Sequence, residues 1–154
     1  MHIKLLADFP KFVPIVAKWR WDEWGHLDPD RTLNDVVKVL ETHIVPEKIP
    51  QTLIAILGDQ PVGTASLTQH DMKTRMDLSP WLAGVFVPLE YRSRGIASSL
   101  VRAIENLAGE LGYEEIFLYT NSAEGLYKKL EWVEIGREEY KGREIVIMSK
   151  LITS

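Results

Sequence analysis

The stretch WLAGVFVPLEYRSRGIASSL, residues 81–100, decides the fold because a strand, a turn and the start of a helix follow one another in it. Residues 81–87 are almost entirely apolar, which predicts a central buried strand. Gly84 within that strand predicts a bulge or the close approach of another chain segment. Apolar residues then recur at helical spacing from 97 to 111, and Gly112 marks the end of that helix.

The turn between this strand and this helix combines positive charge with a glycine. The first turn of any helix has unpaired N–H groups and the positive end of the helix dipole, so negative charge suits it better than positive charge. Arg92 and Arg94 therefore indicate a bound anion. Gly95 lets the backbone approach a ligand without a Cβ, and Ala97 keeps the next turn small. The turn predicts a phosphate or pyrophosphate site, with a merely basic start of a helix as the alternative.

Hydrophobic periodicity assigns the rest of the chain to a mixed α/β pattern. The predicted strands are residues 2–6, 52–57, 62–70, 115–120, 132–140 and 143–151, and the predicted helices are residues 9–24, 32–44 and 123–130. Thr32 with Asp35 resembles a capping signal, Pro46 closes that helix, and Lys141-Gly142 is typical of a hairpin turn. The resulting element order is βααβββαβαββ. The strand–helix–strand unit within residues 81–120 implies two parallel strands joined by a right-handed crossover.

The composition is that of one globular domain, residues 1–154, because 45% of the residues are hydrophobic and 26% are charged. The net charge of −4 argues against non-specific nucleic-acid binding, which needs a basic face. The absence of cysteine excludes disulfides, thiolate metal sites and a cysteine nucleophile. The histidines show no metal-ligand spacing, and we expect no metal site. They are His2, His26, His43 and His70.

Neither a signal peptide nor a membrane span is expected. Asp8 and Pro10 interrupt the apolar N-terminal segment. The longest apolar run, residues 81–89, is far shorter than the ~20 residues that a membrane helix needs. We therefore expect a soluble cytoplasmic protein with no nucleic-acid or membrane partner.

Two blocks of this sequence resemble the GNAT superfamily of acetyl-CoA-dependent N-acetyltransferases. The pyrophosphate loop of that family reads Q/R-x-x-G-x-G/A, and residues 92–97, RSRGIA, fit it. The family also often reads N-x-A-x-x-L-Y-x-x-L-G-F/W near its C-terminus. The matching residues here are Asn121, Ala123, Leu126, Tyr127, Leu130 and Trp132. Three residues depart from the family pattern: Pro88 lies one position earlier than the family's proline, Ser93 replaces a common glycine, and Glu131 replaces the glycine of the second block. The substitution at Glu131 puts the turn after the predicted helix 123–130 in doubt.

The resemblance implies an α/β (α+β) GNAT fold. Its mixed central sheet has six to seven strands, its two parallel strands splay apart, and it has about four helices. Acetyl-CoA is the implied co-substrate, with its pantetheine arm bonded to the strand backbone at Val85 and Val87. A bulge near Gly84 would aim an N–H at the thioester carbonyl. The implied coenzyme-binding residues are Val85, Val87, Arg92, Ser93, Arg94, Gly95, Ile96, Ala97, Ser98 and Asn121.

The resemblance implies that Tyr127 protonates the departing thiolate, while a core aromatic on a short helix is the alternative. Asn121 with Glu124 three residues on also predicts an N-cap, which we favour over direct catalysis. The amine needs a base. Glu23 and Asp71 are candidates, as are His26 and His70, although each is more commonly a solvated loop residue.

The first predicted helix ends in three tryptophans. Trp19 lies on the apolar stripe, whereas Trp21 and Trp24 lie off it beside acidic residues. In the family this region borders the acceptor, and aromatic and acidic walls suit an organic cation such as an aminoglycoside-like or polyamine-like amine. Ordinary packing or a homodimer contact is the alternative. We therefore expect acetyl transfer to a small primary amine, against transfer to a protein N-terminus or lysine, or a non-catalytic acyl-CoA sensor.

Overall fold

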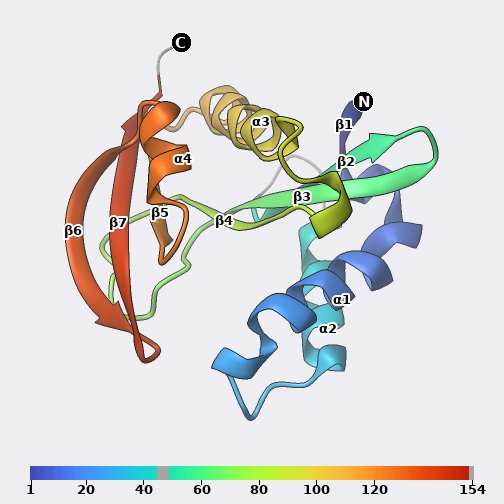
Figure 1. Ribbon diagram of the computed structural model, residues 1–154, viewed down its shortest axis with the longest axis horizontal. Coiled ribbons are helices and arrows are strands. Elements are labelled where there is room, and N and C mark those ends of the chain that lie inside the picture. The colour runs from blue at the N-terminus through green and yellow to red at the C-terminus, as the bar shows by residue number, and fades with distance from the viewer. Residues whose placement is uncertain (45–48, 153–154) are drawn as a thin grey trace.

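The computed structural model describes residues 1–44 and 49–152, which form a seven-stranded mixed sheet in the order β1-β2-β3-β4-β5-β7-β6 (Figure 1). The strands are β1 (His2–Leu5), β2 (Gln51–Leu57), β3 (Gln60–Thr68), β4 (Trp81–Phe86), β5 (Glu115–Thr120), β6 (Val133–Tyr140) and β7 (Arg143–Leu151). The α-helices are α1 (Val13–Trp24), α2 (Leu33–Glu41), α3 (Ile96–Glu110) and α4 (Glu124–Lys129). This order confirms the predicted βααβββαβαββ pattern.

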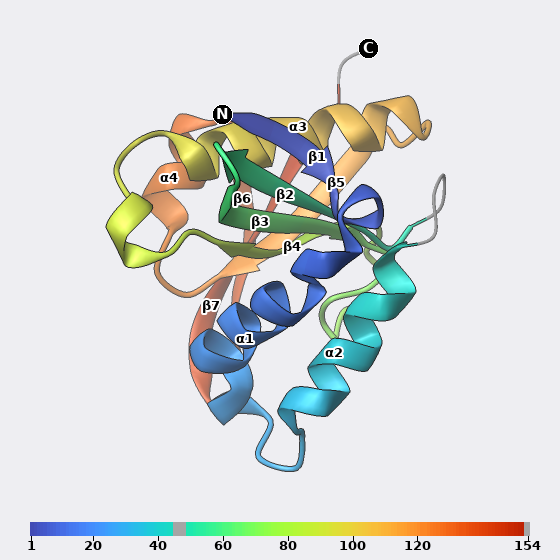
Figure 2. The same cartoon turned by 90° about the vertical axis from the view of Figure 1, so that its right-hand side faces the viewer.

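The helices cover both faces of the sheet. Helix α3 lies across one face, and α1 and α2 lie together against the other, as the two perpendicular views agree (Figures 1 and 2). Leu100, Val101 and Ile104 of α3 are fully buried in the core that includes β2, β3 and β4. Val16 of α1 and Leu40 of α2 are fully buried in a second core on the opposite face. The amphipathic patterns of these helices therefore point toward the sheet from two sides.

Strands β4 and β5 separate soon after they meet. Their parallel pairing has a single register pair, Trp81 with Phe117, next to a hydrogen bond of 3.0 Å from the Phe117 N–H to the Pro80 carbonyl. Trp81 is fully buried there, and its indole N–H donates to the Leu78 carbonyl at 2.8 Å. The sheet therefore consists of β1–β4 and β5-β7-β6, joined at one end and open at the other.

The predicted irregularity in the central strand is a β-bulge. Thr64 pairs with Phe86 and Ser66 pairs with Ala83, so the third strand advances two residues while β4 advances three. Gly84 lies within that interval with a φ of +62°, in the left-handed region that favours glycine. The bulge therefore turns β4 away from its neighbour where the two halves of the sheet part.

Local signals in the sequence set most element boundaries. Thr32 and Asp35 form the predicted capping box, with N–H to oxygen distances of 2.9 and 3.1 Å. The predicted helix 9–24 begins with a 3₁₀ turn, Pro10–Phe12, before α1 proper. The predicted hairpin turn at Lys141-Gly142 has φ angles of 52° and 76°. Pro46, expected to close the second helix, lies outside the described residues. No helix in residues 1–44 or 49–152 is long and apolar enough to cross a membrane.

Candidate active site

The turn between β4 and α3 forms a concave backbone surface. Ser93 and Gly95 have φ angles of 64° and 80°, and Gly95 is the N-cap of α3. Left-handed residues that alternate with ordinary ones direct successive N–H groups to one side, and the first turn of α3 adds its own unpaired N–H groups. A Cβ at Gly95 would have no neighbour within 4 Å, so the space over this turn is open. The turn thus has the shape of the predicted anion site.

The two arginines of this turn differ in their contacts. The Arg92 Nε donates to the Val87 carbonyl at 2.8 Å, and its guanidinium lies 5.7 Å from the centre of the Phe86 ring. The Arg94 guanidinium lies 5.6 Å from the Tyr91 ring, and both arginines are exposed. Arg92 thus occupies one of the two acceptor positions of the Val87 carbonyl.

A cavity of about 680 Å³ lies where β4 and β5 diverge. Its lining includes Gly84 and Val85 of β4, Leu118, Tyr119 and Thr120 of β5, and Asn121, Ala123 and Tyr127 from the segment that follows. The opposite wall comes from α1 and α2 and the segment between them, and charged side chains are frequent in the lining. These side chains are Arg20, Glu23, Asp28, Arg31, Asp71, Lys141 and Arg143. The volume is in the range of small-molecule sites.

Tyr127 projects into this cavity from α4. Its ring is buried and meets the Trp132 ring edge-on at 6.1 Å. Its hydroxyl makes no hydrogen bond within the described part of the chain, so it is free to meet a ligand. Burial raises the pKa of Tyr127 to about 12, which keeps the phenol protonated at neutral pH. The predicted acid is therefore in the cavity and in the protonated form.

The C-terminal end of α4 keeps a glycine-like conformation without a glycine. Glu131 has a φ of 72°, and the Trp132 N–H donates to the Tyr127 carbonyl at 2.9 Å. This bond closes the helix as a glycine at C′ ordinarily does. The departure from the family pattern at Glu131 thus leaves the turn intact, at a backbone cost of roughly 1–2 kcal/mol.

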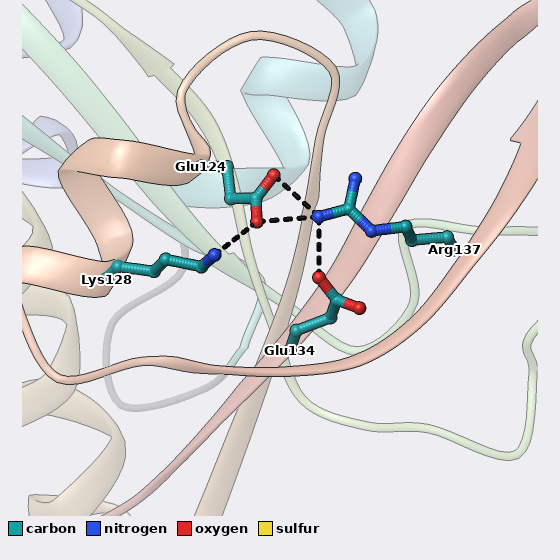
Figure 3. Close-up of polar contacts among 4 residues, drawn as sticks. All are labelled: Glu124, Lys128, Glu134 and Arg137. Carbon is teal, nitrogen blue, oxygen red and sulfur yellow. Dashed lines mark hydrogen bonds and ion pairs between the residues drawn. The ribbon is translucent and has the colours of Figure 1, made fainter.

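Helix α4 is also tied to β6 by an ion-pair network (Figure 3). The Arg137 Nη2 lies 2.8 Å from a carboxylate oxygen of Glu124 and 2.7 Å from one of Glu134. Lys128 reaches Glu124 at 2.7 Å. These pairs are largely exposed, so each contributes little stability, but together they fix the orientation of the short helix that carries Tyr127.

Asn121 is not the N-cap of this helix, and that prediction is wrong. The N-cap is Ala123, which provides no side-chain hydrogen bond. Instead the Thr120 hydroxyl accepts from the N–H groups of Ser122 and Ala123, at 3.3 and 3.0 Å. Because Thr120 satisfies these donors, Asn121 is left exposed in the lining of the cavity.

The candidate bases are placed differently. Asp71, Glu23 and His70 line the cavity, whereas His26 is exposed and does not line it. Asp71 is half-buried, and burial raises its pKa to about 6, although Arg20 and Lys141 oppose that rise. A carboxylate with such a pKa is ionised at neutral pH and is basic enough to accept a proton.

Of the clustered tryptophans, only Trp24 lines the cavity. Its ring meets the Phe86 ring edge-on at 6.3 Å, and Trp19 contacts the same ring at 5.7 Å. Trp19 and Trp21 pack against the core between α1 and α2, which accounts for Trp21 by ordinary packing. Trp24 is therefore the aromatic side chain of the first helix that faces the cavity, and Phe86 packs against it outside the lining.

Sequence reasoning missed Arg20, which lies at the bulge. Its Nη2 donates to the Ser66 hydroxyl, and a Cβ on Gly84 would lie only 2.7 Å from that same nitrogen. A usable signal was present, because Val13, Val16 and Arg20 share one helical face and the two valines are buried. An arginine on the buried face of a helix is a marker of a polar site.

The described residues contain no group of three or more His, Cys, Asp or Glu side chains placed to hold a metal ion.

Comparison with known proteins places the chain among acetyltransferases. The family model described as "Acetyltransferase (GNAT) family" matches residues 13–132. N-acetyltransferase 8 of Homo sapiens is 27% identical over 126 residues, which cover 79% of this chain and 54% of that protein. The chain therefore spans about half the length of this curated relative.

Solved structures share the fold. Aminoglycoside 6'-N-acetyltransferase complexed with coenzyme A has a TM-score of 0.77 at 16% identity, over 100% of this chain and 98% of that one. Ard1 from Thermoplasma volcanium has a TM-score of 0.74 at 16% identity, over 99% of this chain and 98% of that chain. The predicted seven-strand topology with its splayed parallel pair agrees with these neighbours. Since the family match extends from α1 to the end of α4 and includes both sequence blocks, the chain belongs to the GNAT acetyltransferase family.

Proposed function

We propose that this protein transfers the acetyl group of acetyl-CoA to a primary amine of a small molecule, by direct attack of the amine on the thioester. One observation supports this function above all. The cavity opens at the separation of β4 and β5, and β4 leads through residues 87–91 to the backbone surface at the start of α3. A ligand with an extended arm and a pyrophosphate suits that arrangement, and a structural neighbour has been solved with coenzyme A.

The residues of this chain fit the coenzyme. The N–H groups around Gly95 and the first turn of α3 would hold the pyrophosphate, with Arg94 adding charge. The unpaired edge of β4 at Val85 and the N–H of Val87 would bond to the pantetheine amides, as an added strand does. The bulge at Gly84 would direct an N–H toward the thioester oxygen.

Transfer requires two proton movements, and the cavity has a group suited to each. The amine nitrogen bonds to the thioester carbon, its excess proton passes to Asp71 directly or through one water, and the carbon–sulfur bond breaks. The thiolate takes a proton from the Tyr127 hydroxyl. Solvent then returns a proton to Tyr127 and removes one from Asp71. Glu23 and His70 are alternative acceptors for the amine proton because they line the same cavity.

A small acceptor fits the cavity better than a protein chain does. The volume of about 680 Å³ suits a drug-sized molecule, and Trp24 supplies an aromatic side chain to its lining. Structural neighbours described as aminoglycoside acetyltransferases act on small amines, which supports this choice. The alternatives are transfer to a protein N-terminus and acyl-CoA binding without turnover. Either alternative would give a thermal shift with acetyl-CoA but no acetylation of small amines.

Acetyl-CoA should stabilise the folded protein. At a concentration of ~100 Kd the linkage is about 2.7 kcal/mol, or roughly 5–10 °C in Tm for a chain of this size. NAD and ATP should give much smaller shifts in differential scanning fluorimetry. Equal shifts with NAD, or none with acetyl-CoA, would remove the coenzyme site from the account.

Gly95→Ala should weaken coenzyme A about tenfold, because its Cβ enters the open space where the pyrophosphate would lie. Gly112→Ala is a matched control. Gly112 also has a positive φ, 91°, and a Cβ added there would have no neighbour within 4 Å, but Gly112 lies beyond the C-terminal end of α3, away from the proposed pyrophosphate site. Both variants should lose similar stability in thermal melts. Calorimetric titration should show weaker binding only for Gly95→Ala, and equal affinities would contradict the proposed cradle.

Tyr127→Phe should lower kcat about 10²-fold and leave coenzyme A affinity nearly unchanged, because it deletes one hydroxyl and keeps the ring against Trp132. Tyr113→Phe, a partly buried tyrosine outside the cavity, should turn over normally. Steady-state kinetics on an accepted amine measures both. If Tyr127→Phe turns over at the parent rate, then Tyr127 is a packing residue and water protonates the thiolate.

Asp71→Asn should lower kcat/KM and remove an acidic limb near pH 6 from the pH–rate profile, where Asp71 loses its basicity. It should also raise Tm at pH 8. The folded pKa, about 6, exceeds the ordinary value of 3.8, so ionisation of Asp71 costs stability as pH rises through this window, and asparagine cannot ionise. A variant that keeps the acidic limb would transfer the role to Glu23 or His70.

A further inference from the structure

Three arginines that line the cavity have no carboxylate partner. Within residues 1–44 and 49–152, no carboxylate lies at ion-pair distance from Arg20, Arg31 or Arg143. Lys141, the other cationic side chain of the lining, is paired with Asp28 at 3.0 Å. The cavity therefore concentrates unpaired guanidinium groups in a chain whose net charge is −4.

Arg20 is held only by neutral groups. Its Nη2 donates to Ser66, whose hydroxyl lies 2.7 Å from that of Thr52, which in turn lies 2.8 Å from Nδ1 of His43. Burial lowers the pKa of His43 to about 4, and the nearby charge of Arg20 adds to this effect, so the ring is neutral at pH 7. The network fixes the position of the guanidinium without compensating its charge.

The environment of Arg20 disfavours an isolated cation. Burial lowers its pKa to about 10, Asp71 opposes this effect, and the charge of Arg31 reinforces it. The Arg20 Nε is buried and has no hydrogen-bond partner in the described residues. Asp71 acts on Arg20 without reaching ion-pair distance, so the guanidinium would gain from an anion that enters the cavity and contacts it directly.

Arg143 is a second arginine of the cavity lining with an unsatisfied nitrogen. Its Nε is likewise buried without a partner among the described residues. Burial and the charge of Asp71 raise the pKa of the Tyr119 hydroxyl, and the charge of Arg143 opposes that rise. Asp71 and Arg143 therefore both influence the pKa of this hydroxyl. Arg143 therefore adds to the unpaired positive charge of the cavity lining.

Arg20 is also close to the proposed reaction centre. A Cβ on Gly84 would lie 2.7–3.2 Å from its guanidinium atoms, so Arg20 lies directly on the bulge beside which the thioester would be held. An anion bound to Arg20 would therefore be within a few bonds of the attacking amine.

We propose that the acceptor is an amine that carries a carboxylate a few bonds from its nitrogen, as an α-amino acid or its derivative does, and that Arg20 binds this carboxylate. The planar guanidinium matches a carboxylate in two parallel hydrogen bonds. A polyamine or aminoglycoside would instead bring positive charge to unpaired arginines. This inference rests on the proposed acetyl transfer and narrows its acceptor.

The test is a comparison of matched acceptors. The common L-amino acids, the corresponding amino-acid amides, spermidine and kanamycin are assayed with acetyl-CoA. The amino acids should exceed their amides in kcat/KM by about 10- to 100-fold, the range that a charge-assisted hydrogen bond supports. In Arg20→Gln this ratio should fall close to one. Because Arg20 also lowers the pKa of Asp71, its loss changes the rates of both acceptors, and the ratio between them is the readout.

Lys18→Gln is the control, since Lys18 lies on the same helix, is exposed and is paired with Asp22. It should keep the parent ratio. If Arg20→Gln does not fold, then Arg20→Lys, which keeps the charge but loses the planar pair of hydrogen bonds, should reduce the ratio by a smaller factor in the same assay, and an unchanged ratio there counts against the proposal.

Two results would overturn the inference while leaving acetyl transfer in place. One is equal or better turnover of amides, spermidine or kanamycin by the parent protein. The other is an equal loss for amino acids and amides in Arg20→Gln, which would assign Arg20 to the thioester instead.

If no amine is acetylated, the proposed function fails, and binding decides the inference. Calorimetric titration of the protein loaded with coenzyme A then compares N-acetyl-amino acids with their amides. Tighter binding of the acids, lost in Arg20→Gln, upholds a carboxylate site. Equal binding, or no binding, overturns it.

Discussion

The parting of two parallel strands after a single register pair is the constraint on which the rest of the structure depends. Trp81 and Phe117 join β4 to β5 at one end, and the bulge at Gly84 then turns β4 away. Backbone groups that a continuous sheet would pair are left to a ligand, and a cavity forms between the two halves. The long α3 on one face and the α1–α2 pair on the other hold this opening in place (Figure 2).

The same opening explains why charged groups tolerate burial here. Arg20 and Asp71 each have a pKa displaced toward the neutral form, which shows that their positions cost stability in the folded chain. Side chains with such pKa values gather where chemistry needs them. Ser66, Thr52 and His43 hold Arg20 through neutral contacts, so its charge remains available to a ligand. The cavity thus combines a fixed guanidinium with a carboxylate of raised pKa.

Local sequence signals were enough for the fold and for part of the site. The order of elements, the bulge at Gly84 and the left-handed Gly95 followed from periodicity and glycine placement. The family resemblance pointed to Tyr127, and this residue lines the cavity. Contacts between distant segments were not readable: Arg20 meets Ser66 and Gly84 only after α1 packs on the sheet. Asn121 failed as a cap because its neighbour Thr120 makes the same hydrogen bonds.

Backbone amide hydrogen exchange with and without acetyl-CoA tests the central claim most directly, because the account assigns the gap between β4 and β5 to the coenzyme. Binding should slow exchange at Val85 and Val87 and in the turn around Gly95, and leave the outer strand β6 unchanged. Exchange that stays the same at β4 while the protein is saturated with acetyl-CoA would contradict the account, since the coenzyme would then lie elsewhere.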